Sequence, residues 1–205
     1  LSCNGTSNVL FRNDGARNDP KYPNEEWKFT DVSRRSRVQE PAYSFPTWFW
    51  DYDNDGWLDI FVSGYKLSDV GDIAADYLGL PHGAERARLF RNDGKGRFTD
   101  ETESAGVFKL LHTMGCNYGD LDNDGFLDFY AGTGDPDLGT IIPNRMFRNS
   151  NGRNFQDVTT SGGFGHLQKG HGIAFADLDN DGDQDVYEDM GGAYSGDNYR
   201  NALYE

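Results

Sequence analysis

The residues best suited to chemistry in this chain are aspartates, which recur three times in one nine-residue phrase. Each copy has carboxylates at positions 1, 3, 5 and 9 and a glycine at position 6, which permits a sharp turn. Four close carboxylates repel one another unless a hard cation lies among them, and oxygen-only ligands favour calcium over zinc or copper. The phrase therefore predicts about three calcium ions. Its copies are Asp51-Tyr-Asp-Asn-Asp-Gly-Trp-Leu-Asp59, Asp120-Leu-Asp-Asn-Asp-Gly-Phe-Leu-Asp128 and Asp177-Leu-Asp-Asn-Asp-Gly-Asp-Gln-Asp185.

The predicted metal ligands are the four aspartates of each loop. They are Asp51, Asp53, Asp55 and Asp59 in loop one, Asp120, Asp122, Asp124 and Asp128 in loop two, and Asp177, Asp179, Asp181 and Asp185 in loop three. Loop three also fits the EF-hand pattern, because Glu188 stands at its position 12. Position 12 is Val62 in loop one and Ala131 in loop two, and both loops are flanked by strand-like residues. We therefore reject an EF-hand and expect Glu188 and Asp189 to add to the local negative field.

The plain alternative is that these aspartates only cap turns on a solvated surface. Three copies with identical spacing argue against it. An empty loop would hold four like charges close together, so ion binding would contribute directly to the free energy of folding. We therefore expect the calcium to be structural rather than regulatory.

Segments outside the loops repeat as well, which indicates a recurring unit of four short strands. One strand ends just before a loop, as at 44–50 and 170–176, and a second begins where the loop ends, as at 58–62, 127–131 and 184–187. A third strand is expected at each Phe-Arg-Asn segment and at the similar start Asn201-Ala-Leu-Tyr204, and a fourth at 27–32, 96–100 and 154–159. Asn-Asp-Gly after the third strand is typical of a tight hairpin turn. The third-strand segments begin at Asn8, Arg88, Asn144 and Asn201.

The spacing of the loops locates one insertion. Residues 66–81 lengthen the first interval between loops, and their apolar residues have helical spacing that ends at Gly79 and Pro81. A short helix is therefore predicted there. A long loop at 132–143 follows the second strand of the next unit, so the helix and this loop are expected on one rim.

A four-stranded meander repeated about every 60 residues is typical of a propeller blade. The sequence predicts two complete blades, 43–102 and 112–159, and two partial ones, 8–32 and 170–205. Residues 1–205 then form a single repeat domain or a section of a larger propeller. The alternative is a tight three-bladed ring in which the two partial blades complete each other, but we favour the section.

The loops and the Asn-x-Leu-Phe-Arg-Asn segments resemble the FG-GAP/VCBS repeats of integrin-α-like β-propellers. The chain is also similar to secreted bacterial relatives of cartilage acidic protein, without their ASPIC/UnbV segment. The resemblance implies blades, extracellular or cell-surface placement, and a role in adhesion or protein interaction. It also implies a backbone carbonyl ligand at position 7 of each loop, from Trp57, Phe126 and Asp183.

Composition narrows the function classes. A formal net charge of −15 argues against a nucleic-acid partner, and no apolar run is long enough to span a membrane. Cys3 and Cys116 are too few for a disulfide scaffold and either pair or stay free, with a buried Cys116 thiol favoured. The four histidines lack metal-site spacing and no nucleophile motif is present, so an enzyme is not expected.

The leading hypothesis is a secreted, calcium-stabilised module with a protein or glycan ligand on the rim opposite the calcium loops. The aromatic residues of 43–50 raise glycan binding as an alternative, although packing is the commoner role of aromatics in strands. Partial blades at both ends suggest homo-assembly into a surface or fibre component. An accessory domain of a polysaccharide-acting enzyme is the remaining alternative.

Overall fold

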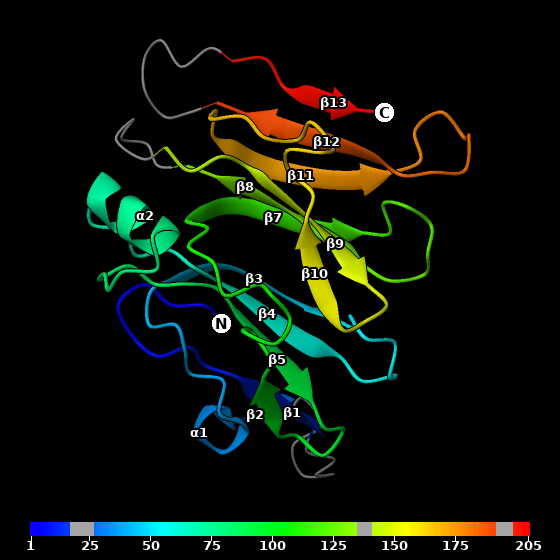
Figure 1. The fold of residues 1–205 in the computed structure, drawn as a ribbon. Helices are drawn as coiled ribbons and strands as arrows, with labels where there is room; N and C mark the ends of the chain where they lie inside the picture. Colours follow the sequence, from blue (N-terminus) through cyan, green and yellow to red (C-terminus); the bar gives the residue numbers. More distant parts are fainter. Residues whose placement is uncertain (17–26, 135–140, 192–198) are drawn as a thin grey trace.

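The computed structural model describes residues 1–16, 27–134, 141–191 and 199–205, and they form an all-β protein with two short helices (Figure 1). This confirms the predicted fold class. The strands are β1 Phe11–Ala16, β2 Trp27–Asp31, β3 Ser44–Trp50, β4 Asp59–Gly64, β5 Arg88–Asn92, β6 Phe98–Asp100, β7 Thr113–Gly119, β8 Asp128–Thr133, β9 Arg145–Ser150, β10 Asn154–Asp157, β11 Gly170–Ala176, β12 Asp185–Met190 and β13 Ala202–Tyr204. The helices are α1 Ser33–Ser36 and α2 Val70–Tyr77.

The strands form four antiparallel sheets, each a meander of sequence neighbours. Sheets β3–β6 and β7–β10 have four strands each, whereas β1–β2 has two and β11–β13 has three. Their arrangement is consistent with β-propeller blades, complete in the four-stranded sheets and partial in the other two, and the sheets stand in a row with β1–β2 at one end and β13 at the other (Figure 1). Among the described residues the two incomplete sheets do not pair with each other, so these residues form no three-bladed ring.

Each Asp-rich loop joins the first two strands of a sheet. The pairs Trp50↔Asp59, Gly119↔Asp128 and Ala176↔Asp185 close the three hairpins at the same register. The ninth aspartate of every loop is thus the first residue of a strand, one residue later than the sequence predicts. All three loops project from one end of their sheets (Figure 1).

The apolar cores lie between neighbouring sheets rather than within one sheet. The largest joins the two complete blades and includes Trp50, Phe61, Phe129, Phe147 and Phe155. A second core joins sheet β7–β10 to sheet β11–β13. At that contact a Cβ on Gly115 would come within 1.4 Å of the His171 carbonyl oxygen, so only glycine allows β7 and β11 to approach this closely.

The structure differs from the sequence predictions at three places. In the first repeat Asn13 and Gly15 remain inside β1 at a register shift, so this Asn-Asp-Gly segment is a bulge rather than a hairpin turn. Trp48 and Trp50 pack in the core, but Phe45 and Phe49 are exposed because alternate residues of β3 face away from it. Helix α1 was not predicted, since four residues carry no helical period.

The predicted helix at 66–81 is present as α2, with Asp69 accepting a hydrogen bond from the Gly71 N–H at its start. None of its residues is buried. The loop expected on the same rim has residues 135–140 outside the described part of the chain. Cys3 and Cys116 are both free, and burial raises the pKa of the Cys116 thiol to about 12.

Candidate metal centres

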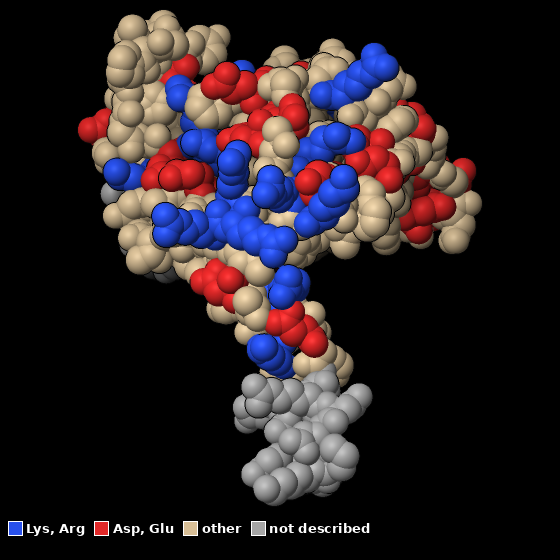
Figure 2. Space-filling model, turned by 90° about the horizontal axis from the view of Figure 1, so that it is seen from below, with Lys and Arg blue, Asp and Glu red and all other residues tan. Residues whose placement is uncertain are grey.

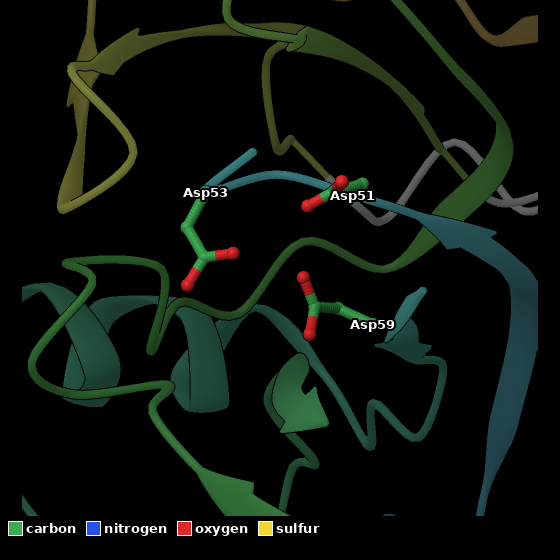
Figure 3. A group of neighbouring side chains, drawn as sticks. All are labelled: Asp51, Asp53 and Asp59. Carbon is green, nitrogen blue, oxygen red and sulfur yellow. The ribbon is translucent and has the colours of Figure 1, made fainter. Parts of the chain in front are cut away.

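Three carboxylates converge in each Asp-rich loop. One oxygen each of Asp51, Asp53 and Asp59 lies within 4.8 Å of the other two, and Figure 3 shows these side chains pointing toward a shared space. The same holds for Asp120, Asp122 and Asp128 and for Asp177, Asp179 and Asp185. The structure therefore brings together positions 1, 3 and 9 of the predicted ligand set in every loop. Because these groups offer only carboxylate oxygen, their chemistry fits a hard cation.

The fifth aspartates lie outside these groups of three. Oδ1 of Asp55 accepts a hydrogen bond from the Trp57 N–H at 2.9 Å, and Asp124 and Asp181 accept from Phe126 at 2.9 Å and Asp183 at 3.1 Å. These bonds turn each side chain back onto its own loop. Asp55, Asp124 and Asp181 as ligands, and the carbonyls of Trp57, Phe126 and Asp183, stay predictions.

The ninth aspartate forms the buried floor of each site. Asp59 and Asp128 are 0 % exposed and Asp185 is 4 % exposed. Asp59 accepts backbone hydrogen bonds from Asn92 at 2.8 Å and Tyr52 at 3.3 Å, while Asp128 accepts from Asn149 and Leu121, both at 2.7 Å. Burial nevertheless raises the pKa of Asp59 to about 7 and that of Asp128 to about 6. An ionised carboxylate here is therefore under-compensated by the protein alone, and a cation above it would supply the missing charge.

Asparagine and glycine shape the loops. The fourth residue of each loop, Asn54, Asn123 or Asn180, has a left-handed backbone with φ of 56°, 55° and 62°. The glycine at position 6 also has positive φ, and the Gly56 N–H donates to the first aspartate, Asp51, at 2.9 Å. These residues fold the loop around the carboxylates. Side chains at position 4 also reach the neighbouring loop, as Asn54 Nδ2 does to the Gly125 carbonyl at 2.8 Å.

Two arginines from third strands pair with the loops, which was not predicted from the sequence. Arg91 contacts Asp53 and lies 2.6 Å from Asp55, whereas Arg148 contacts Asp122. The recurring Phe-Arg-Asn segment was the available signal. In the last sheet Tyr204 pairs with Val186 as Phe90 pairs with Ile60, so Glu205 takes the register position of Arg91.

Glu188 does not enrich the field at loop three, contrary to our expectation. It lies within β12 and is 0 % exposed. Its carboxylate accepts hydrogen bonds from Tyr130 at 3.0 Å and Asn144 at 2.8 Å, and it lies 2.7 Å from His166 Nε2. The strand carries this side chain into the interface with the preceding sheet, which also rules out an EF-hand ligand role. Asp189 is exposed.

Comparison with known families gives one match. The model of the FG-GAP-like repeat matches residues 51–131 and 120–188, so the matched regions include all three Asp-rich loops. A search of curated proteins finds no match.

Proposed function

Because the chain belongs to the FG-GAP-like repeat family, we propose that it is a calcium-stabilised module for adhesion or protein interaction outside the cytosol. FG-GAP repeats suggest the interaction role. The three carboxylate groups support the calcium role, since each combines three convergent oxygens with a buried floor. Within the described residues no helix is long and apolar enough to cross a membrane. We propose no catalytic activity.

The repeated three-carboxylate group carries this proposal. Calcium is the hard cation that tolerates irregular cages of carboxylates and carbonyls, and it is abundant outside cells. A cation in each loop would hold the first two strands of a sheet together at their shared hairpin. Such an ion contributes to stability because it binds the folded chain and not the unfolded one.

The rim opposite the loops is our candidate partner surface. Loop one precedes β4 and α2 follows it, so the two lie at opposite ends of that strand (Figure 1). Tyr77 is 86 % exposed and Leu78 is 67 % exposed, and Val70 and Leu80 are exposed beside them. Exposed apolar groups of this kind are typical of protein contact sites.

The calcium role is tested by thermal unfolding in calcium and in EDTA, together with native mass spectrometry. We expect bound ions and a melting temperature about 5 °C or more higher in calcium. An unchanged melting temperature with no bound ion would exclude calcium stabilisation.

The partner surface is tested by deleting residues 67–80, once a partner is in hand. The deletion should weaken partner binding and leave calcium affinity unchanged, because α2 lies away from the loops. Loss of both would show that this assignment of the rims is wrong.

Glycan binding is a second candidate, supported by one groove. It has a volume of about 400 Å³ and lies between the β1–α1 region and the first complete blade. Phe11, Phe49 and Phe98 line it together with Arg12, Arg35 and Lys95. Lys and Arg gather on the face around α1 although the chain is acidic overall (Figure 2). Such a groove suits an acidic sugar, whose anionic groups pair with guanidinium.

Titration with an oligogalacturonate tests the groove. We expect saturable binding that weakens in Arg35→Ala and Phe49→Ala but not in Phe45→Ala, because Phe45 does not line it. Equal binding by all variants would remove this candidate.

Self-assembly is supported by free strand edges. Among the described residues β1 pairs only with β2 and β13 only with β12. Light scattering with and without EDTA tests it, and a strict monomer at high concentration would contradict it.

A further inference from the structure

We infer that the three loops bind their cations as a coupled row, in which Asn54 and Asn123 are positioning residues for the next loop along the chain. The inference rests on the proposed calcium function, because it concerns the same three sites. Its basis is a pair of hydrogen bonds that join loops far apart in sequence.

The two hydrogen bonds join equivalent positions of neighbouring loops and have the same length. Asn54 Nδ2 donates to the Gly125 carbonyl at 2.8 Å, across 71 residues. Asn123 Nδ2 donates to the Gly182 carbonyl at 2.8 Å, across 59 residues. In both cases position 4 of one loop reaches position 6 of the next. A bond that recurs at the same positions in two separate interfaces is a feature of the repeat and not an accident of one surface.

Each bond ends on a peptide group that already serves the carboxylates of the receiving loop. The N–H of Gly125 donates to Asp120 Oδ2 at 3.0 Å. The peptide that carries the Gly125 carbonyl also carries the Phe126 N–H, which donates to Asp124 at 2.9 Å. A hydrogen bond on the oxygen of a peptide strengthens donation by its N–H. Asn54 therefore helps to hold the turn of loop two at Gly125, where successive N–H groups bind Asp120 and Asp124.

The donor is equally tied to its own loop. Asn54 stands between Asp53 and Asp55, and its left-handed backbone fixes the direction of the side chain. A cation that fixes the carboxylates of loop one thereby fixes the amide that supports loop two. Since equilibrium coupling is reciprocal, a cation in loop two must strengthen binding in loop one by the same factor.

Asn180 supplies a matched control. It has the same backbone conformation as the other two asparagines, but among the described residues its amide makes no hydrogen bond to another loop. Replacement by glycine is the suitable change at all three positions, because glycine accepts a left-handed backbone without strain and removes only the side chain.

The experiment is a double-mutant cycle on the full chain with terbium as the calcium probe. Loop one contains Trp57 and directly follows Trp50, whereas loops two and three contain no Trp, so luminescence excited through tryptophan alone reports terbium in loop one. Its affinity is measured in the wild type, Asn54→Gly, Asp122→Asn and the double variant. Asn180→Gly is the control, and circular dichroism verifies folding.

We expect Asp122→Asn to weaken terbium binding in loop one about five-fold, the lower end of typical site-to-site coupling. In the Asn54→Gly background the same change should have almost no further effect, and Asn180→Gly should leave loop one unchanged. Asn54→Asp, which keeps the side-chain size but loses the amide donor, should also abolish the coupling.

Two results would overturn the inference in distinguishable ways. If terbium binds but Asp122→Asn has the same effect on loop one with and without the Asn54 amide, Asn54 does not couple the two loops and the inference is wrong, while the calcium proposal stands. If neither terbium nor calcium binds, the proposed function falls and the coupling falls with it.

Discussion

Loop one and loop three share the spacing of their aspartates but not their surroundings. Loop one has a guanidinium beside it, because Arg91 pairs with Asp53 and Asp55. Its Trp57 ring lies so close to Gly94 that a Cβ there would come within 2.5 Å of it. Loop three has Asp183 in place of Trp57 and Glu205 at the register position of Arg91.

The difference shows that one motif can depend on its ion to different degrees. In loop one the Asp53 carboxylate raises the pKa of Arg91, so the protein supplies part of the compensating charge. In loop three Asp183 adds a negative charge, and its interaction with Asp181 raises the pKa of Asp183. Loop three should therefore depend most on a bound cation for its order.

The first and last repeats also differ within their sheets, at position 12 counted from the start of each loop. Val62 in the first complete blade packs among aliphatic and aromatic side chains. Glu188, its counterpart in the last sheet, is held by Tyr130, Asn144 and His166. One interface is thus closed by apolar packing and the other includes a buried polar network.

The largest expected effect comes from this network. Glu188→Ala should lower the free energy of unfolding by about 3–5 kcal/mol, because it removes the buried carboxylate that binds Tyr130, Asn144 and His166 and leaves a cavity in its place. Val62→Ala, the matched change in the other interface, should cost about 1–3 kcal/mol. Urea unfolding in calcium measures both. If the glutamate variant is no less stable than the valine variant, the network does not hold that interface together.

Chelation of calcium should reveal a difference in local stability between loop one and loop three. In EDTA we expect endoproteinase Asp-N to cut loop three about ten-fold faster than loop one, which corresponds to about 1.4 kcal/mol in the free energy of local opening. Loop three offers the enzyme one additional aspartate, Asp183, so mass spectrometry of early fragments compares the cuts at loop positions 1, 3, 5 and 9, which both loops share. Calcium should slow both cuts, and equal rates in EDTA would contradict the proposed difference.

The smallest expected effect is that of Arg91 on the stability of the calcium-free protein. Arg91→Gln should destabilise the calcium-free protein by about 0.5–1 kcal/mol, because the pair with Asp53 and Asp55 is partly exposed. Glu205→Arg should slow Asp-N cleavage of loop three in EDTA by supplying the absent cation. Melting temperature and digestion rate provide the measurements. No change in either variant would mean that arginine does not stand in for charge at these loops.

The features that the repeat itself encodes could be predicted from the sequence. The loops, the strands beside them and α2 were predictable, because the aspartate phrase fixes the register of its own hairpin. Arg91 beside Asp53 was not, because the contact joins residues 38 apart through strand pairing. Burial of Glu188 and exposure of Phe49 depend on which neighbouring sheet covers each face, and a local period contains no information about that.

The placement of the cores between sheets has a mechanical consequence. Because each apolar layer is shared by two sheets, a sheet taken out of the row would lose its apolar contacts with the sheets beside it, while the hydrogen bonds within its hairpins would remain. Force that separates one sheet from the next would act on side-chain packing and on the asparagine bonds between loops. Force along a strand would instead load the hairpin that an Asp-rich loop closes, so ions in those loops would oppose shear within a sheet more than they oppose peeling of one sheet from another.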